Sequence, residues 1–228
     1  MMQILSISKV LTHDTLNITS IEEATLSVHP DIESYDYIII NGGDGTIRRV
    51  IKQLHTLDTL PKIILNPTGS FNVIAKMHRV PKLEDVLEKL AQGEVPNTQP
   101  QQVYTLNKEV FLFSAGNMGD LQHIFLSETL RFGILKNGIA KYLLAVLFLF
   151  PVHLIMTPFM LLSPRRFFIF TPASFISKFG SFYGKVEEPI TIDLENGYNL
   201  MELDGDVVTV EESVLQIDVV GSVEVVTL

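Results

Sequence analysis

The sequence predicts an α/β domain followed by a β-rich domain. As far as Gly93, short apolar runs typical of strands alternate with segments of helical spacing, which is typical of a Rossmann-like domain built on a parallel sheet. From Val103 onward, short alternating segments are separated by turn residues, which favours a sandwich-like arrangement of strands. We place the boundary between Gly93 and Tyr104 and divide the chain into residues 1–100 and residues 101–228.

The first domain is organised around one short buried strand, Tyr37 to Ile40, whose residues are apolar and β-rich. A helix is predicted from Thr46 to about Leu57, because apolar residues recur there at helical spacing. The other elements expected in this domain are strands at 4–7 and 16–18, a strand or helix at 21–28, a strand at 62–65, a helix at 73–77 and a helix from Leu83 that ends at Gly93.

The second domain is predicted to consist mainly of strands. Residues 103–106 and 110–114 are expected to form a hairpin around a turn at Asn107-Lys108. Two further strands are clearest at 190–194 and 214–220. Turns are expected at 195–198, at Asp204-Gly205 and at 220–222.

The turn after the central strand is the first candidate for a binding site. Its sequence is Gly42-Gly43-Asp44-Gly45-Thr46. A glycine turn that leads into a helix presents bare backbone N–H groups and a positive dipole end, which suit phosphate. Asp44 is expected to point at whatever the turn binds, and Thr46 can cap the helix. The alternative is a structural turn that is merely rich in glycine.

A second loop follows the next strand. It contains Gly69, Ser70 and Asn72, and in a parallel sheet it should face the same crevice as the first glycine turn. The hydroxyl of Ser70 and the amide of Asn72 can bind a nucleotide or its phosphates. The equally weighted alternative is that both residues cap the helix that follows.

Composition limits the classes of partner. The formal net charge of −9 argues against nucleic acid, and the absence of cysteine excludes disulfides and thiolate metal sites. Apolar residues make up 46% of the chain and the mean hydropathy is positive. The absence of cysteine fits a cytoplasmic protein, and no signal-peptide pattern is visible at the N-terminus.

These motifs resemble those of the diacylglycerol kinase catalytic domain family, which includes bacterial lipid kinases and sphingosine kinases. The turn at 42–46 is similar to the family's Gly-Gly-Asp-Gly-Thr, a signature related to that of NAD kinases. Residues 67–72 are similar to Pro-x-Gly-Thr-x-Asn, and Asp204-Gly205-Asp206 is similar to a C-terminal Asp-Gly-Glu. The resemblance implies an ATP-binding first domain and a lipid-binding second domain.

The resemblance also implies roles for individual residues. Asp44 would help to hold Mg²⁺ beside the ATP phosphates, and Asp206, or Asp44 itself, would accept the proton of a lipid hydroxyl. The phosphates would be bound by Gly42, Gly43, Gly45, Thr46, Gly69, Ser70 and Asn72.

The chain departs from the family's pattern at several places. Residues 7–10 carry no glycine where the family has a glycine loop, and Val73 stands where aspartate is usual. Asp206 is one methylene shorter than the family's glutamate, and no aspartate loop for a structural magnesium is evident. These departures leave open a weakened or inactive lipid-binding regulatory relative. A soluble NAD kinase-like enzyme is a second alternative.

Residues 142–163 form a long apolar stretch that contains no acid and no Lys or Arg. It is interpreted as a lipid-facing surface, with a buried core segment and a transmembrane helix as alternatives. Lys136 and Lys141 precede it, and Arg165 and Arg166 follow it. The expected partners are therefore a lipid alcohol and the inner face of the membrane, bound peripherally, and a homodimer is left open.

Overall fold

A computed structural model describes residues 2–69, 71–117, 158–159 and 161–228. Contacts between residues divide the chain into two compact units, one formed by Met1–Leu112 with Val219–Leu228 and the other by Phe113–Asp218. The last ten residues of the chain thus belong to the first unit. The domain boundary predicted between residues 100 and 101 stays a prediction.

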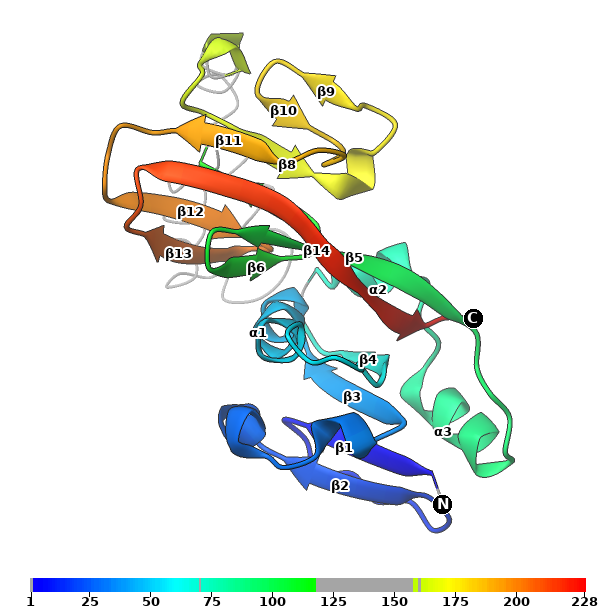
Figure 1. Cartoon of the computed structure of the whole chain (residues 1–228). Helices are drawn as coiled ribbons and strands as arrows, with labels where there is room; N and C mark the ends of the chain where they lie inside the picture. The colour runs from blue at the N-terminus through cyan, green and yellow to red at the C-terminus, as the bar shows by residue number, and fades with distance from the viewer. Residues whose placement is uncertain (1, 70, 118–157, 160) are drawn as a thin grey trace, which may run out of the picture. The chain divides into compact units, whose positions relative to one another are not determined.

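The first unit contains the predicted parallel sheet (Figure 1). Strands β1, β2, β3 and β4 pair in parallel in the order β2-β1-β3-β4, and β14, β5 and β6 extend the sheet beyond β4. The bounds are β1 Gln3–Ile7, β2 Asn17–Ile21, β3 Tyr37–Gly42, β4 Lys62–Pro67, β5 Thr98–Leu106, β6 Glu109–Phe111 and β14 Val214–Val226.

Both faces of this sheet are buried. The helix α3 (Leu83–Ala91) packs its apolar side chains on the face that carries Ile39 and Ile64. Ile38 and Ile40 point to the opposite face and are also fully buried, as strand alternation requires. The remaining helices are α1 Asp44–Leu54 and α2 Val73–Met77, with short 3₁₀ turns η1 Glu23–Val28 and η2 Ile32–Ser34.

The second unit is β-rich, as predicted. Its sheet has the order β13-β12-β7-β8-β10-β9. The bounds are β7 Ser114–Gly116, β8 Phe168–Phe170, η3 Thr171–Ala173, β9 Lys178–Phe179, β10 Phe182–Tyr183, β11 Ile190–Asp193, β12 Asn199–Leu203 and β13 Asp206–Val210. Met201, Leu203, Ala115 and Ile169 are fully buried on one face of this sheet.

Some predicted elements were wrong. The hairpin at Asn107-Lys108 is confirmed, but its second strand ends at Phe111, and Ser114 belongs to β7 in the other sheet. The turn predicted at 220–222 does not form, because β14 continues through Gly221 to Val226. β14 therefore pairs with β11 near its start and with β4 near its end (Figure 1).

Candidate functional site

The glycine turn lies at the carboxyl end of β3, as predicted. β3 ends at Gly42, and α1 begins at Asp44, two residues earlier than expected. Gly43 occupies the N-cap position, and no described side chain caps the helix. The prediction that Thr46 is the cap was wrong, because Thr46 lies inside the first turn. The backbone N–H groups at the start of α1 thus keep the character of an anion-binding helix end.

Glycine is required at Gly42 by close packing. A Cβ atom there would lie 2.5 Å from the Cβ of Thr46, which is closer than real Cβ atoms approach other heavy atoms. The turn therefore folds tightly back on the first turn of α1. The Thr46 hydroxyl accepts a hydrogen bond at 3.3 Å from Arg49, whose guanidinium also pairs with Glu23.

The second loop packs directly against the first. Gly42 and Pro67 are partners in the parallel register, and the Thr68 N–H donates to the Gly42 carbonyl at 3.1 Å. A Cβ atom on Gly69 would lie 2.8 Å from the Cα of Gly43, so the two glycine backbones touch. The structure therefore brings the two predicted loops together, and glycine makes this contact sterically feasible.

Asp44 connects the two loops through its side chain. Its Oδ2 accepts the Val73 N–H at 2.8 Å and its Oδ1 accepts the Ile74 N–H at 3.1 Å, so the carboxylate caps the first turn of α2. The side chain is buried. The negative charge of the Asp44 carboxylate is favourable at the start of α2, because the N-terminal end of a helix carries a partial positive charge. This capping role was not predicted from the sequence.

Asn72 organises the second loop. Its Oδ1 accepts the Gly69 N–H at 3.0 Å, and its Nδ2 donates to the Gly69 carbonyl at 2.6 Å. Asn72 stands at the N-cap position of α2 with φ near 48°, yet its side chain forms no capping bond to the helix. Ser70 and the side-chain role predicted for it lie outside the described residues.

A polar ladder joins the carboxyl ends of three neighbouring strands. Asn66 Nδ2 donates to Asn41 Oδ1 at 2.7 Å. Asn41 Nδ2 then donates to Ser6 Oγ at 3.1 Å and to the Ile7 carbonyl at 2.8 Å. These residues were missed by sequence reasoning. Polar residues at the ends of successive apolar strands were the available signal, since parallel strands end at one edge of the sheet.

The first loop of the chain turns sharply without glycine. Ser8 adopts a left-handed conformation with φ of 67°, and Ser6 Oγ donates to the Lys9 carbonyl at 2.7 Å. The missing glycine therefore does not prevent the chain from turning after β1. A non-glycine residue in this conformation carries some backbone strain.

Asp206 lies in the second unit, where it is the first residue of β13 and is partly exposed. The predicted Asp204-Gly205 turn is confirmed, because β12 and β13 form a hairpin around it.

Asp204, two residues before Asp206, has a structural role that sequence reasoning missed. The buried Asp204 carboxylate accepts the N–H groups of Phe113 and Ser114, both at 2.9 Å.

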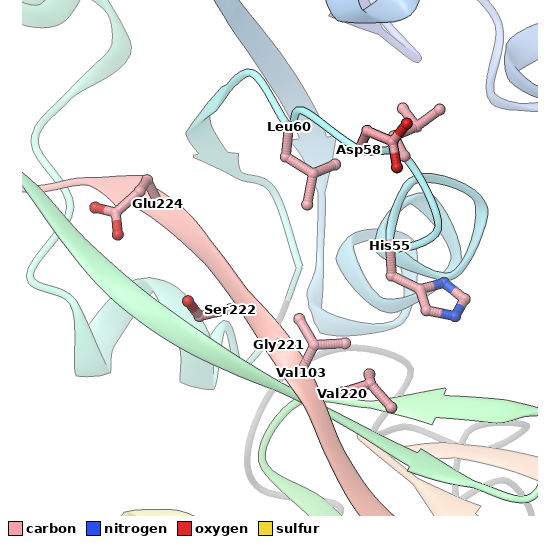
Figure 2. A pocket seen from close by; sticks show the side chains of 9 residues that line it. His55, Asp58, Leu60, Val103, Val220, Gly221, Ser222 and Glu224 are labelled. Carbon is pink, nitrogen blue, oxygen red and sulfur yellow. The ribbon is translucent and has the colours of Figure 1, made fainter.

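A pocket of about 430 Å³ opens in the first unit, away from the predicted site residues. Its lining comes from the chain after α1, from β5 and from β14 (Figure 2). His55 and Glu224 come from separate elements and point apart in this view. His55 is bound to the Lys52 carbonyl at 2.9 Å. Because none of the residues of the two glycine loops lines it, this pocket is distinct from the candidate site.

The described ranges contain no cluster of three or more His, Cys, Asp or Glu side chains placed to hold a metal ion. Within the same ranges, no helix has the length and apolar character needed to cross a bilayer. Most of the apolar stretch at 142–163, for which three interpretations were open, lies outside the described residues.

Comparison with known proteins agrees with the glycine-loop motifs. Residues 6–103 match the diacylglycerol kinase catalytic domain. A protein of Streptococcus pneumoniae assigned as a lipid kinase is 28% identical over 110 residues, covering 47% of this chain and 37% of that protein. A diacylglycerol kinase of Bacillus subtilis is 31% identical over 114 residues, covering 49% of this chain and 36% of that protein. The chain thus matches little more than a third of either relative's length.

A solved structure extends the likeness to the whole fold. A protein from Bacillus anthracis assigned as a diacylglycerol kinase superposes with a TM-score of 0.56, covering 100% of this chain and 97% of that chain. The sequence identity is 14%, so this match supports the fold alone. Residues 6–103, which contain the paired glycine loops, are thus similar to the diacylglycerol kinase catalytic domain.

Proposed function

We propose that the chain is a lipid kinase that transfers the γ-phosphoryl group of ATP to the hydroxyl of a diacylglycerol- or sphingoid-type lipid. The observation that carries this proposal is the glycine turn at 42–46, inside the family match, followed by a helix start that no described side chain caps. Such a helix start is suited to bind phosphate through backbone N–H groups.

The two loops have separate tasks in this proposal. Gly42, Gly43, Gly45 and Thr46 bind the terminal phosphates through the backbone N–H groups at the start of α1. Gly69, Ser70 and Asn72 shape the other wall. The Asn72 amide is already engaged with Gly69, so its contribution is to hold the loop in position.

Asp44 fits a role as a magnesium ligand. Each of its oxygens accepts one N–H group, and an ionised carboxylate retains further acceptor capacity. Mg²⁺ in kinase sites is commonly bound through one or two carboxylates together with substrate phosphates. When bound, the ion would neutralise the charge that develops on the transferred group. Asp44 itself is held in a fixed orientation by α2.

The chemical step exchanges one phosphorus–oxygen bond for another. A bond forms between the lipid hydroxyl oxygen and the γ-phosphorus, and the bond from the γ-phosphorus to the bridging oxygen breaks, so that ADP leaves. In this proposal Asp206 accepts the proton of the hydroxyl, the role of a carboxylate that acts as a general base.

A diacylglycerol with two acyl chains lies in a bilayer, so the proposal includes peripheral binding of the enzyme to the inner face of the cytoplasmic membrane.

The proposal is tested with radiolabelled γ-phosphate of ATP and a panel of alcohols in mixed micelles. The panel contains a diacylglycerol, a sphingoid base, a monoacylglycerol and NAD⁺. We expect Mg²⁺-dependent label in one lipid product. Label in NAD⁺ alone would instead identify a soluble nucleotide kinase and contradict the proposal.

A second function, a regulatory lipid-binding relative without turnover, is favoured by one observation. The family's usual aspartate is replaced by Val73, so the carboxylate expected at this position is absent. In that case the chain binds lipid and labels none of the four acceptors. Equilibrium binding of a fluorescent diacylglycerol in the presence of ATP, without label transfer, would establish this function in place of the kinase.

A further inference from the structure

The segment from 158 to 185 of the second unit carries large apolar side chains on its surface. Phe175 is 85% exposed, Leu162 82% and Phe179 67%. Water-exposed aromatic side chains that gather within one segment are unusual, and such patches mark interaction sites. Phe159 and Ile176, from the same segment, are also exposed.

Hydrogen bonds and tight packing fix these side chains to one small substructure. The Ser181 N–H donates to the Leu161 carbonyl at 2.8 Å, and Ser181 Oγ donates to the same carbonyl and to that of Ser163. A Cβ atom on Gly180 would lie 2.4 Å from the Leu161 oxygen. The chain around Leu162 is therefore held against the turn between β9 and β10 (Figure 1).

The loop that carries Phe175 is held in a similar way. A Cβ atom on Gly184 would lie 2.1 Å from the Ile176 oxygen and 2.4 Å from the Ala173 oxygen. The Gly184 N–H donates to the Ser177 carbonyl at 3.1 Å. Phe175, Phe179 and Leu162 are thus presented by segments that are bound to one another, and we call this set the hairpin surface.

The charge of this part of the chain is opposite to that of the whole. No acidic residue occurs between Glu128 and Glu187, whereas the full chain has a net charge of −9. Lys178 and Lys185 lie at the two ends of the β9–β10 hairpin, and Arg166 lies beside β8. Lys178 lies 4.8 Å from the centre of the Tyr183 ring, Lys185 lies 3.9 Å from Glu187 in an exposed ion pair, and Arg165 pairs with Glu195. Exposed aromatic residues beside cations suit an anionic lipid surface.

We infer that the hairpin surface binds anionic bilayers, with Phe175, Phe179 and Leu162 entering the acyl boundary and Lys178 and Lys185 facing lipid phosphates. The inference rests on the proposed function, because a lipid kinase must reach its substrate in the membrane. It adds the partner and the residues that bind that partner. It assigns membrane binding to described residues that follow most of the apolar stretch at 142–163.

Liposome flotation without ATP tests this inference. Vesicles contain phosphatidylcholine alone or with phosphatidylglycerol. We expect the full chain to float with the anionic vesicles and less at high salt. Because burying each aromatic side chain contributes free energy equivalent to about tenfold or more in affinity, Phe175→Ser with Phe179→Ser should lower the bound fraction at least about tenfold.

Two matched controls separate binding from general surface effects. Tyr198→Ser removes an aromatic side chain that is also 67% exposed but lies near Glu195, and it should float like the wild type. Lys178→Glu with Lys185→Glu should weaken binding, whereas Lys89→Glu on α3 should not. Circular dichroism establishes that each variant is folded.

The inference is overturned if the wild type does not float with anionic vesicles. That result is expected if the hairpin surface binds another protein and not a bilayer. It is also overturned if the two Phe variants float as well as the wild type, or if Tyr198→Ser loses as much binding. Transfer to a short-chain, water-dispersed diacylglycerol is measured in parallel. Flotation without transfer would contradict the proposed function alone, and transfer without flotation would contradict only this inference.

Discussion

At the scale of single residues, Asp44 binds the start of α2 and has a proposed role at the phosphates, and Asp44→Asn affects both. Asp44→Asn keeps the shape but removes one of the two acceptor oxygens that bind α2. Hydrogen bonds to charged groups contribute about 1.5–3 kcal/mol, so we expect a loss of stability of this order. Transfer should fall by at least about 100-fold, since the charge proposed to act beside the phosphates is also lost. Thermal unfolding and the transfer assay measure the two effects.

The control for Asp44→Asn is Asn72→Ala. This variant loosens the second loop by removing both bonds to Gly69 while it leaves the Asp44 charge in place. We expect a smaller loss of transfer for it at a comparable loss of stability. Equal losses of transfer in both variants would assign Asp44 a positioning role only.

Asp206 and Asp204 lie two residues apart, and we expect opposite results when each is changed. Asp206→Ala should leave the fold intact and lower transfer by about 10²–10⁴, the range for a general base. Asp204→Ala leaves the buried Phe113 and Ser114 N–H groups without their acceptor. It should destabilise the chain by about 1–3 kcal/mol for each unsatisfied group. Urea unfolding and the transfer assay distinguish them. Wild-type transfer in Asp206→Ala would make Asp206 a turn residue only.

The sequence predicted where Asp44 lies but not what it contacts. Its place inside a glycine turn follows from local pattern, because a buried strand, three glycines and a helical spacing are all readable within a short stretch. Its bonds to Val73 and Ile74 depend on the pairing of β3 with β4, which only the tertiary fold provides. Asp204 was missed for the same reason, because Phe113 and Ser114 are remote from it along the chain.

At the scale of elements, the contact between the two glycine loops should be sensitive to a single methyl group. The Cβ of Gly69→Ala would meet the Gly43 Cα at 2.8 Å and the Asn72 Oδ1 at 2.7 Å, so the loops must separate. We expect destabilisation of about 1–3 kcal/mol, as for other overpacked sites, and a lower transfer rate. Differential scanning calorimetry and the transfer assay provide the measurements.

Gly197→Ala is the matched control for this substitution. Its Cβ would meet only the Glu211 oxygen, at an ordinary 3.6 Å, so stability and transfer should hardly change. If Gly69→Ala behaved like Gly197→Ala in both measurements, close packing of the loops would not matter for the site.

Most elements of the first unit were predictable because each has a clear local period. The helix at 73–77 was predicted with the bounds that the structure shows, and α3 begins at Leu83 as predicted and ends at Ala91, two residues before the predicted end at Gly93. β14 was predicted only in part. Gly221 and Ser222 have the composition of a turn, yet pairing of the strand end with β4 keeps the backbone extended. Long-range strand pairing overrides local turn preference here.

At the scale of the whole molecule, buried tyrosines should make the fold sensitive to alkali. Burial raises the pKa of the Tyr104 phenol above its ordinary value of 10.0, and burial, followed by the charge of Asp36, does the same for the pKa of Tyr37. The unfolded chain therefore loses these protons first. The stability from both groups is fully present below pH 10.0 and is lost as pH rises towards the folded-state values.

Chemical denaturation at a series of pH values above neutrality checks this expectation. The free energy of unfolding should be steady up to about pH 9 and fall above about pH 10, because tyrosine titrates near 10 when unfolded. Tyr104→Phe should make the fall shallower. An unchanged slope in this variant would show that other groups cause the alkaline loss.

In the proposed function, this chain transfers the γ-phosphoryl group of ATP to a lipid alcohol. The decisive assay follows label from the γ-phosphate of ATP into chloroform-extractable lipid, with diacylglycerol in mixed micelles and folded chain. We expect labelled lipid that increases with time, requires Mg²⁺ and falls at least about 100-fold with Asp44→Asn. Label that stays in the aqueous phase with every lipid alcohol of the panel would contradict the claim.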